Sequence, residues 1–372
     1  MRVLQFIPSL HKGGAERMFV DLANNLLKNG CDVEILLAYQ SPPQLNQYRL
    51  DTTIPISIIG TQRKSRFFRY VSIAAWTFMN RNKLKDFDII HTHLNDGLII
   101  GLVIKILFCF TPRQMRPRLV FTCHMVGMAV PKASLLANSL GIYLFDEFVL
   151  MAADNFWRKR SDSKARSCVS VISNGIDWNV NENYLQTELE QFQKNSLLRI
   201  GTLTRLEPER DPVKFLDLFS LVQKNMDRDN FRFIIGGDGS LNESIHAYAK
   251  SCDLLENIDF KGLVIDSSEF LRNLDIYVSL NICDQTGVAA LEAIFQGIPV
   301  VGIQIDKKYT AKDSDFIWSS SDLNCVSDRI VQLSFNENLR KEVHESQFKT
   351  ATERFTGQVM ALNYLERYNR VG

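Results

Sequence analysis

The sequence lacks an apolar run long enough to cross a membrane. A spanning helix needs about 20 consecutive apolar residues, and the longest candidate, residues 98–110, is interrupted by Lys105. The chain also begins with an apolar run at residues 3–7, without the basic region and cleavage site of a secretory signal peptide. We therefore expect a cytoplasmic protein without a membrane-spanning helix.

Cysteine is scarce and scattered. Seven cysteines occur among 372 residues, an odd number with no C-x-x-C pair. Disulfide frameworks and zinc sites need paired or clustered cysteines, so this pattern indicates reduced thiols. The positions are Cys31, Cys109, Cys123, Cys168, Cys252, Cys283 and Cys325.

Clusters with the spacing of a metal site are also lacking. Three D-x-D pairs, at residues 86–88, 227–229 and 313–315, lie beside expected strands or in loops, and we interpret them as turn residues. We expect His91 and His93 to alternate between the faces of a strand, which is poor geometry for two ligands of one metal. We therefore expect neither a metal nor a cofactor.

No charge of one sign dominates the whole chain, whose net charge is +1, but its two halves differ. Residues 1–180 hold 22 basic and 13 acidic residues, a net charge of +9, and the remainder has −8. A basic half suggests an anionic partner. The alternative is a chance difference between two solvated surfaces. We expect no nucleic-acid partner.

What is present is an alternation of strands and helices typical of an α/β protein. The length suggests two domains, and 45% apolar with 23% charged residues is ordinary globular composition. Apolar spacing in the first half predicts the opening of a doubly wound parallel sheet. The expected strands are 3–7, 33–37, 88–91, 119–123 and 169–172, and the expected helices are 15–28, 67–78 and 98–107.

A second Rossmann-like unit begins after a polar stretch at residues 181–197. We expect domains at residues 1–185 and 186–355, with residues 356–372 forming a helix that packs back on the first domain. The expected strands are 198–201, 231–236, 258–261, 276–280 and 300–303, and the expected helices are 212–223, 241–250, 269–272, 288–295, 328–333, 338–352 and 358–368. Ligands of such sheets bind at the carboxyl ends of the strands, and facing domains share one ligand.

Gly13 and Gly14 follow the first strand and open the first helix. Glycines let a backbone approach a ligand, and unpaired helix amides favour an anion. A plain tight turn is the alternative. The segment is not G-x-G-x-x-G, which disfavours a nicotinamide dehydrogenase.

Arg205 and Arg210 flank the loop after residues 198–201. Two guanidinium groups at a strand's carboxyl end can neutralise a diphosphate. The alternative is a solvated charged loop, because acidic residues interleave with the arginines.

Residues 284–292 bracket a turn from a loop into a helix. A phosphate could rest on the amides of Thr286, Gly287 and Val288, which lie in the first turn. Asp284 could bind sugar hydroxyls while Glu292, two turns into the helix, reaches another part of the same ligand. The alternatives are a helix cap for Asp284 and a buried carboxylate paired with a base for Glu292.

Together these segments resemble the retaining glycosyltransferases of family 4, which have the GT-B fold of two facing Rossmann-like domains with a ligand cleft between them. The resemblance covers nearly the whole chain. The matching segments are G-G-A-E-R at 13–17, D-I-I-H-T-H at 88–93, I-S-N-G-I-D at 172–177, R-L-E-P-E-R at 205–210, G-G-D-G-S-L at 236–241 and the E-x7-E motif at 284–292.

The resemblance assigns roles to individual residues. Gly13, Gly14, Gly237 and Asp238 belong to the donor site, where Arg205 and Arg210 neutralise the diphosphate and Thr286, Gly287 and Val288 bind its phosphates. The backbone of Leu263 and Val264 holds the base, Glu292 the ribose, and Asp284 the transferred sugar. His124 is the active-site histidine of the first domain; the alternative is a structural histidine. Asp at 284 and Arg at 210 replace the family's Glu and Lys, and residues 131–168 match poorly.

The implied function is transfer of a sugar from a nucleotide-diphosphate donor, UDP by default, to a hydroxyl of a glycan or lipid-linked acceptor in surface polysaccharide or glycolipid synthesis. The alternatives are a catalytically silent GT-B binding subunit and a nucleotide-sugar epimerase or phosphorylase. Basic and aromatic residues interleave over residues 63–85. We therefore expect peripheral attachment to an anionic membrane surface, on its inner face. The alternative is a soluble enzyme whose basic face attracts nucleotide sugars.

Overall fold

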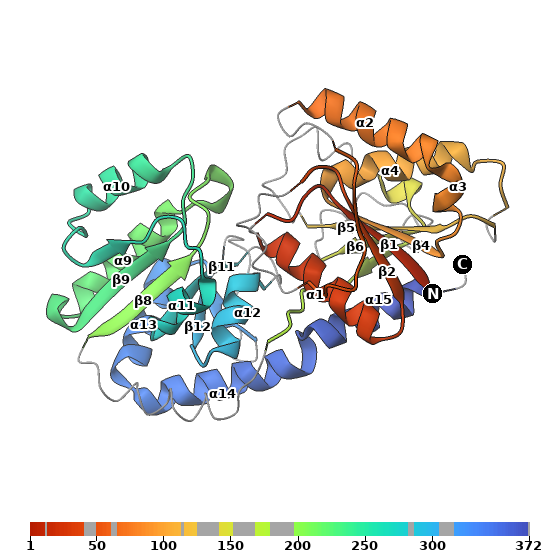
Figure 1. Ribbon diagram of the computed structural model, residues 1–372. Coiled ribbons are helices and arrows are strands. Elements are labelled where there is room, and N and C mark those ends of the chain that lie inside the picture. Colours follow the sequence, from red (N-terminus) through yellow and green to blue (C-terminus); the bar gives the residue numbers. More distant parts are fainter. Residues whose placement is uncertain are drawn as a thin grey trace. The chain divides into compact units, whose positions relative to one another are not determined.

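Two parallel sheets organise the chain, one in each of two units (Figure 1). The first unit comprises Met1–Asp177 with Thr356–Gly372, and the second comprises Trp178–Phe355. The structure is a computed structural model, which describes residues 1–11, 13–40, 50–60, 65–112, 115–124, 141–151, 168–178, 197–281, 286–304 and 316–370. The first unit ends at Asp177 rather than at residue 185, and it includes the C-terminal helix.

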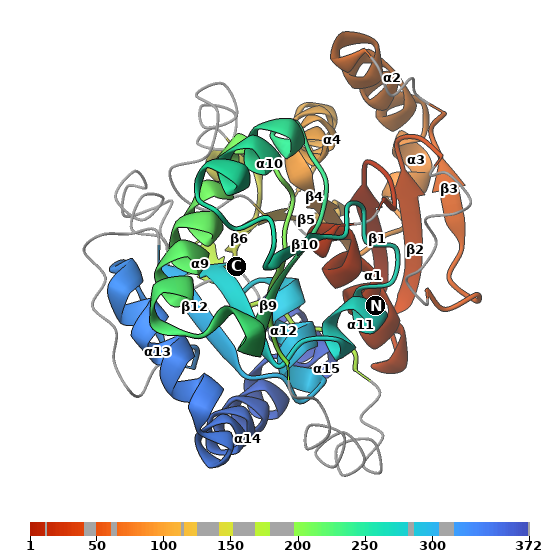
Figure 2. The ribbon, with the colours of Figure 1, turned by 90° about the vertical axis from the view of Figure 1, so that its left-hand side faces the viewer.

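The first sheet is a doubly wound parallel sheet, as the alternation of elements predicts. Its order is β3-β2-β1-β4-β5-β6-β7, with β3 at one edge (Figure 2). The order reverses between β1 and β4, so the carboxyl ends of these strands border the crevice where such sheets bind ligands. The strands are β1 Arg2–Ile7, β2 Asp32–Leu37, β3 Ile56–Ile58, β4 Ile89–His93, β5 Arg118–Cys123, β6 Glu147–Leu150 and β7 Val169–Val171.

Helices cover both faces of this sheet, which explains why its strands are apolar on both sides. In β1, Val3 and Ile7 pack with α1 and α15, whereas Leu4 and Phe6 pack on the opposite side with α2 and α4 (Figure 1). The helices are α1 Gly14–Lys28, α2 Arg66–Met79, α3 Arg81–Leu84, α4 Leu94–Leu107 and α15 Gly357–Tyr368. Strands β3 and β6 were not predicted from the sequence.

The segment I-S-N-G-I-D ties α1 to the end of the first unit. The Asp177 carboxylate accepts hydrogen bonds from Asn25 (2.8 Å) and Lys28 (3.1 Å) of α1. Arg17 donates to the Asp177 carbonyl oxygen (2.7 Å). A Cβ at Gly175 would collide with the carbonyl of Thr356, so only glycine fits where this segment meets the start of α15. Two of the segments that carry the family resemblance therefore fasten the first unit together.

The second sheet has the order β10-β9-β8-β11-β12-β13, again all parallel. Its order reverses between β8 and β11. The strands are β8 Leu198–Leu203, β9 Phe231–Gly236, β10 Ile258–Phe260, β11 Ile276–Asn281, β12 Val300–Gln304 and β13 Ser319–Ser320. The α-helices are α9 Val213–Asn225, α10 Asn242–Ser251, α11 Ser267–Arg272, α12 Val288–Phe295, α13 Leu323–Phe335 and α14 Glu337–Arg354, and two short 3-10 turns lie at Pro208–Arg210 and Arg228–Asn230.

The described residues bear on two expectations, the lack of a membrane-spanning helix and the lack of disulfides. Within those residues, no helix is both long and apolar enough to cross a bilayer. None of the six cysteines that the structure describes is paired in a disulfide; Cys283 lies outside the described residues.

Candidate active site

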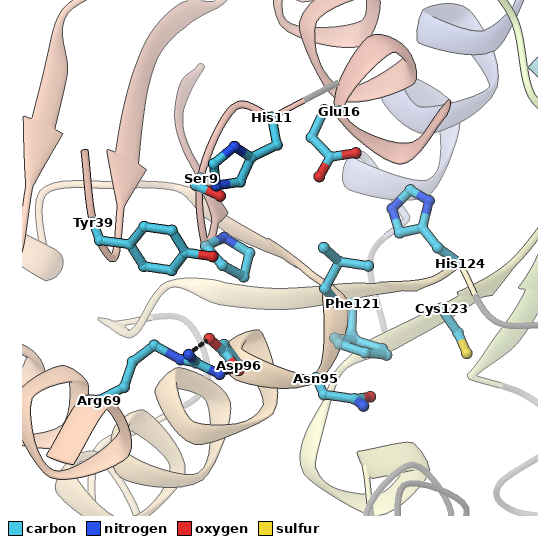
Figure 3. A pocket seen from close by; sticks show the side chains of 12 residues that line it. Ser9, His11, Glu16, Tyr39, Arg69, Asn95, Asp96, Phe121, Cys123 and His124 are labelled. Atoms are coloured by element: carbon cyan, nitrogen blue, oxygen red, sulfur yellow. Dashed lines mark hydrogen bonds and ion pairs between the residues drawn. The ribbon is translucent and has the colours of Figure 1, made fainter. Parts of the chain in front are cut away.

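A cavity of about 250 Å³ opens at the carboxyl ends of the first sheet's strands (Figure 3). Its walls come from several elements, because the loops after β1, β2 and β5 meet the first turns of α1 and α4 there. The polar lining is Ser9, His11, Glu16, Arg69, Asn95, Asp96 and His124, and the remainder is Pro8, Tyr39, Leu94, Phe121 and Cys123. Of these residues, the sequence pointed only to His124.

His124 follows β5 and pairs with a histidine of β4. Its Nε2 lies 3.0 Å from Nδ1 of His93. His91 and His93 lie side by side, with ring centroids 4.1 Å apart. The expectation that they alternate between faces was wrong, because residues i and i+2 of a strand share a face. Nevertheless, among the described residues no group of three His, Cys, Asp or Glu side chains is arranged to hold a metal.

These three histidines are neutral at pH 7. Burial lowers the pKa of His124 to about 4. Burial also lowers the pKa of His91 and of His93 well below the usual value, and the neighbouring imidazoles lower both further. His124 can therefore donate or accept a hydrogen bond in the cavity without carrying a charge there.

A strained residue brings the first turn of α4 to the cavity. Strand β4 runs directly into α4, and Leu94 makes the turn with φ of 61°. Side chains other than glycine, asparagine and aspartate seldom adopt this left-handed conformation. The turn places Asn95 and Asp96 in the cavity wall (Figure 3). The sequence pattern did not locate them there, because it placed the start of the helix at residue 98.

Arg69 of α2 and Asp96 of α4 form a buried ion pair at one side of this cavity (Figure 3). Arg69 Nε lies 2.5 Å from Asp96 Oδ2, and the two side chains are 12% and 7% exposed. The pair joins α2 to α4. Removing either partner would leave the other charge buried without a partner in this pair, which is strongly destabilising.

Glu16 lies over the glycine turn that was expected to approach a diphosphate. Gly13 is the extended N-cap of α1, and a Cβ there would collide with the Glu16 carboxylate. Gly14 is the first residue of the helix. The Glu16 carboxylate thus fills the space beside Gly13, where its negative charge opposes the approach of an anion.

In the second unit, backbone hydrogen bonds connect the loops after β8, β9 and β10. The Gly237 amide donates to the Gly262 carbonyl (2.7 Å), and the Leu206 amide donates to the Asp238 carbonyl (3.1 Å). Gly237 has φ of 129°, and a Cβ there would collide with the Thr204 carbonyl. The described contacts of Gly237 and Asp238 therefore hold neighbouring loops together.

Two of the acidic residues beside Arg205 and Arg210, Glu207 and Asp211, have partners of their own. Glu207 accepts hydrogen bonds from the Ser240 hydroxyl (2.6 Å) and amide (3.2 Å), which lower the pKa of its carboxyl. Asp211 lies 3.6 Å from Lys214. Arg205 is exposed and Arg210 is half-buried, and both follow the carboxyl end of β8.

The charges of Arg210 and Glu292 both act on the hydroxyl of Tyr277 in β11. This buried hydroxyl donates to the Leu203 carbonyl (3.2 Å), and burial raises its pKa to about 12. The Glu292 carboxylate raises this pKa further and the Arg210 guanidinium lowers it, so both charges act on the same hydroxyl. Sequence reasoning missed Tyr277, because its position in an apolar strand resembles an ordinary core residue.

Helix α12 starts at the end of the same sheet. Gly287 is its N-cap and is exposed, with open space around the position of a Cβ. Thr286 is 9% exposed, Val288 half-buried, and Glu292 7% exposed. The first-turn amides thus lie near the surface above a buried carboxylate. Asp284 lies outside the described residues.

The two residues expected to hold the base differ in environment. Leu263 is 66% exposed after a left-handed turn at Gly262. The Val264 side chain packs toward Gly236 and lines a separate cavity of about 580 Å³ with Phe270 and Asp266. The Val264 side chain thus contributes to this cavity, whereas the resemblance assigns the base to the backbone.

Family comparisons agree with the two-unit organisation. The sequence model of Glycosyltransferase Family 4 matches residues 12–179. The model of Glycosyl transferases group 1 matches residues 188–345.

Individual relatives are distant. The Campylobacter jejuni α-1,4-N-acetyl-D-galactosaminyltransferase for a diphosphoundecaprenol-linked GalNAc-GalNAc-diNAcBac glycan is 22% identical over 92% of this chain and 91% of its own length. A Staphylococcus aureus poly(ribitol-phosphate) α-N-acetylglucosaminyltransferase is 24% identical over 48% of this chain, which matches only 36% of that relative. The structure of Anabaena HepE with UDP and glucose has a TM-score of 0.73 at 15% identity, over 99% of both chains.

Proposed function

This chain is a family 4 glycosyltransferase with the GT-B fold, and from that premise we propose that it transfers a sugar from a UDP-sugar to a hydroxyl of a lipid-linked glycan, with retention of configuration. The observation that carries the donor side of this proposal is the shared action of Arg210 and Glu292 on Tyr277, at the strands that flank the order reversal of the second sheet. In a nucleoside diphosphate, the ribose hydroxyls can donate hydrogen bonds to a carboxylate, and the two phosphates can accept them from a guanidinium group.

In this proposal the chain itself stabilises the departing UDP. Arg205, Arg210 and the first-turn amides of α12 supply positive charge and hydrogen-bond donors where charge develops on the leaving diphosphate. The Glu292 carboxylate accepts hydrogen bonds from the ribose. Asp284 is assigned to the transferred sugar on the resemblance alone. No metal ion takes part in this proposal, because the guanidinium groups and amides neutralise the diphosphate.

The cavity of the first unit suits a sugar ring of the acceptor. Its volume, about 250 Å³, exceeds that of one pyranose, and small-molecule sites combine apolar faces with a few placed polar groups. Tyr39 and Phe121 supply apolar surface, and Asn95, Asp96 and neutral His124 supply hydrogen-bonding atoms for hydroxyls.

A lipid carrier is favoured by the outer surface of α2. Five apolar side chains on this helix are 50–76% exposed, although a helix in a water-soluble domain normally turns such residues inward. They are Phe67, Phe68, Val71, Phe78 and Met79. The exposed basic residues Arg81, Lys83 and Lys85 follow directly. We therefore propose that α2 lies against an anionic membrane surface.

The same helix also reaches the cavity. Arg69 points from α2 into the cavity wall and pairs with Asp96, whereas Phe67 and Phe68 point to solvent. A sugar attached to a membrane lipid would therefore meet its pocket beside the surface that contacts the membrane. The diphosphoundecaprenol glycan in the name of the Campylobacter jejuni relative is an acceptor of this class.

The experiment has a binding arm and a catalytic arm. The thermal midpoint of the purified protein is measured with UDP, GDP, ADP and CDP, and we expect UDP to raise it most. UDP release is then followed for UDP-glucose, UDP-galactose and their N-acetylated forms, with and without undecaprenyl-diphosphate-linked sugars. Stabilisation by UDP without release from any donor would favour a silent binding subunit. Stabilisation by another nucleotide alone would overturn the choice of UDP.

A further inference from the structure

We propose that His93 is a positioning residue that fixes the ring of His124. We also propose that the C-terminal helix α15 supports this arrangement through hydrogen bonds to His91 and Thr122, which lie beside His93. This proposal rests on the proposed function, in which His124 contacts a substrate hydroxyl. The role is independent of the identity of the donor sugar and of the acceptor.

His93 has a hydrogen-bonding arrangement that packing alone does not explain. The side chain is fully buried, yet within the described residues its Nε2 has no hydrogen-bond partner. Its other nitrogen, Nδ1, lies 3.0 Å from His124 Nε2. Burying a polar group with an unsatisfied atom costs stability, so a leucine would serve a purely structural role better. The polar contact that remains is the one to the cavity.

The ring of His93 is confined on two sides. His91 lies against it with ring centroids 4.1 Å apart, and Phe19 of α1 meets it edge-on at 5.0 Å. Side chains confined by packing keep one rotamer, so Nδ1 stays directed at His124. The pairing occupies Nε2 of His124, which leaves Nδ1 as the ring nitrogen available to a substrate.

Helix α15 holds His91 in turn. Nδ1 of His91 lies 2.6 Å from the Tyr368 hydroxyl, and its Nε2 lies 2.7 Å from the Thr122 hydroxyl. The Thr122 oxygen lies 2.8 Å from the hydroxyl of Tyr364, which is also on α15. Both nitrogens of His91 are thus fixed. The network runs from the end of the chain to the cavity wall.

The test compares two replacements at position 93 that have the same number and branching of side-chain heavy atoms. Asparagine places a polar atom where Nδ1 of histidine lies, whereas leucine does not. We expect His93→Leu to lower kcat by about 10- to 100-fold, as misplacement of a catalytic group does. KM for the donor should change by less than about threefold, and the thermal midpoint should be unchanged or higher. His93→Asn should keep kcat within about fivefold of wild type. Tyr368→Phe, which removes only the hydroxyl that fixes His91, should lower kcat by about 3- to 10-fold.

A spectroscopic arm keeps this proposal separate from the proposed function. In the protein labelled with ¹⁵N-histidine, we expect His124 to show one fixed neutral tautomer in wild type and in His93→Asn, and an average of two tautomers in His93→Leu. Averaged tautomers in wild type, or wild-type kcat in His93→Leu, would overturn the positioning role. Failure of wild type to release nucleotide from any donor would instead overturn the proposed function, while the tautomer comparison still decides the positioning role.

Discussion

Arg17 donates a hydrogen bond to the carbonyl oxygen of Asp177, across 160 positions of sequence, at 2.7 Å. The same guanidinium pairs with Asp21 at 2.8 Å, and Asp21 accepts from the Asp177 amide at 3.1 Å. The two residues belong to the first and third of the segments that carry the family resemblance. Their described contacts fasten residue 177 to α1, so these two segments have a structural role in the first unit.

Replacing the donor-site charges should abolish transfer and leave the fold intact. We expect Arg205→Ala and Glu292→Ala to lower kcat/KM by about 100- to 1,000-fold, because each removes a charged contact to the leaving UDP, worth about 2–4 kcal/mol at the transition state. UDP release and thermal midpoints check this. Lys214→Ala is the matched control, since this basic residue of α9 pairs with Asp211. Wild-type turnover by Arg205→Ala or Glu292→Ala would show that the site assignment is wrong.

Activity should survive removal of divalent metal. The proposed positive charge at the diphosphate comes from Arg205, Arg210 and amides, so chelation by EDTA has nothing to remove. Transfer rates are measured after dialysis against EDTA and again after adding magnesium or manganese. Loss of activity that either metal restores would contradict this expectation and would make the D-x-D pairs candidate metal ligands.

The two amide replacements of His124 should differ in activity. Asparagine keeps a polar atom at the position of Nδ1, and glutamine keeps one at the position of Nε2. Since Nε2 is occupied by His93, we expect His124→Asn to retain at least about tenfold more kcat than His124→Gln, within the range of a positioned hydrogen-bonding group. Equal activities, or the reverse order, would mean that Nδ1 is not the contacting nitrogen.

Acid should destabilise the first unit through its buried histidines. Their pKa values are lower in the folded state than the usual 6.5, so below pH 6.5 the unfolded chain binds more protons. The free energy of unfolding therefore falls as the pH drops from 6.5 toward 4, by up to about 1.4 kcal/mol per pH unit for each histidine. His93→Asn should remove one such contribution. Urea unfolding at several pH values measures it, and parallel curves for the two proteins would refute the assignment.

The outer face of α2 should be needed for membrane attachment. Phe67→Ser combined with Met79→Ser should reduce co-sedimentation with anionic vesicles by about tenfold or more, because each exposed apolar side chain contributes on the order of 1–2 kcal/mol when inserted. Phe335→Ser, which removes an equally exposed phenylalanine of the second unit, is the matched control. Equal binding of wild type to neutral and anionic vesicles, or binding to neither at low salt, would end the membrane proposal.

Much of the fold was predictable from the order of apolar residues. Strands buried on both faces are short apolar runs, and helices repeat apolar residues every three or four positions, so local sequence determines both. The pattern missed β3, β6 and β13, which are two to four residues long, although it found β7 and β10, which are equally short. It also failed at the start of α4, because the turn at Leu94 depends on a strained backbone that no periodicity encodes.

The sequence by itself determined the fold class and the two Rossmann-like halves, and it pointed to the arginine and α12 segments as a candidate donor site, because these follow from local periodicity and from motifs at the ends of strands. Only the tertiary structure decided which side chains meet. It placed His93 against His124, Arg69 against Asp96 and Arg210 near Tyr277. It also turned the apolar face of α2 to solvent. The reason is physical: contacts between distant residues depend on how the elements pack, and the sequence of each element alone does not specify its neighbours.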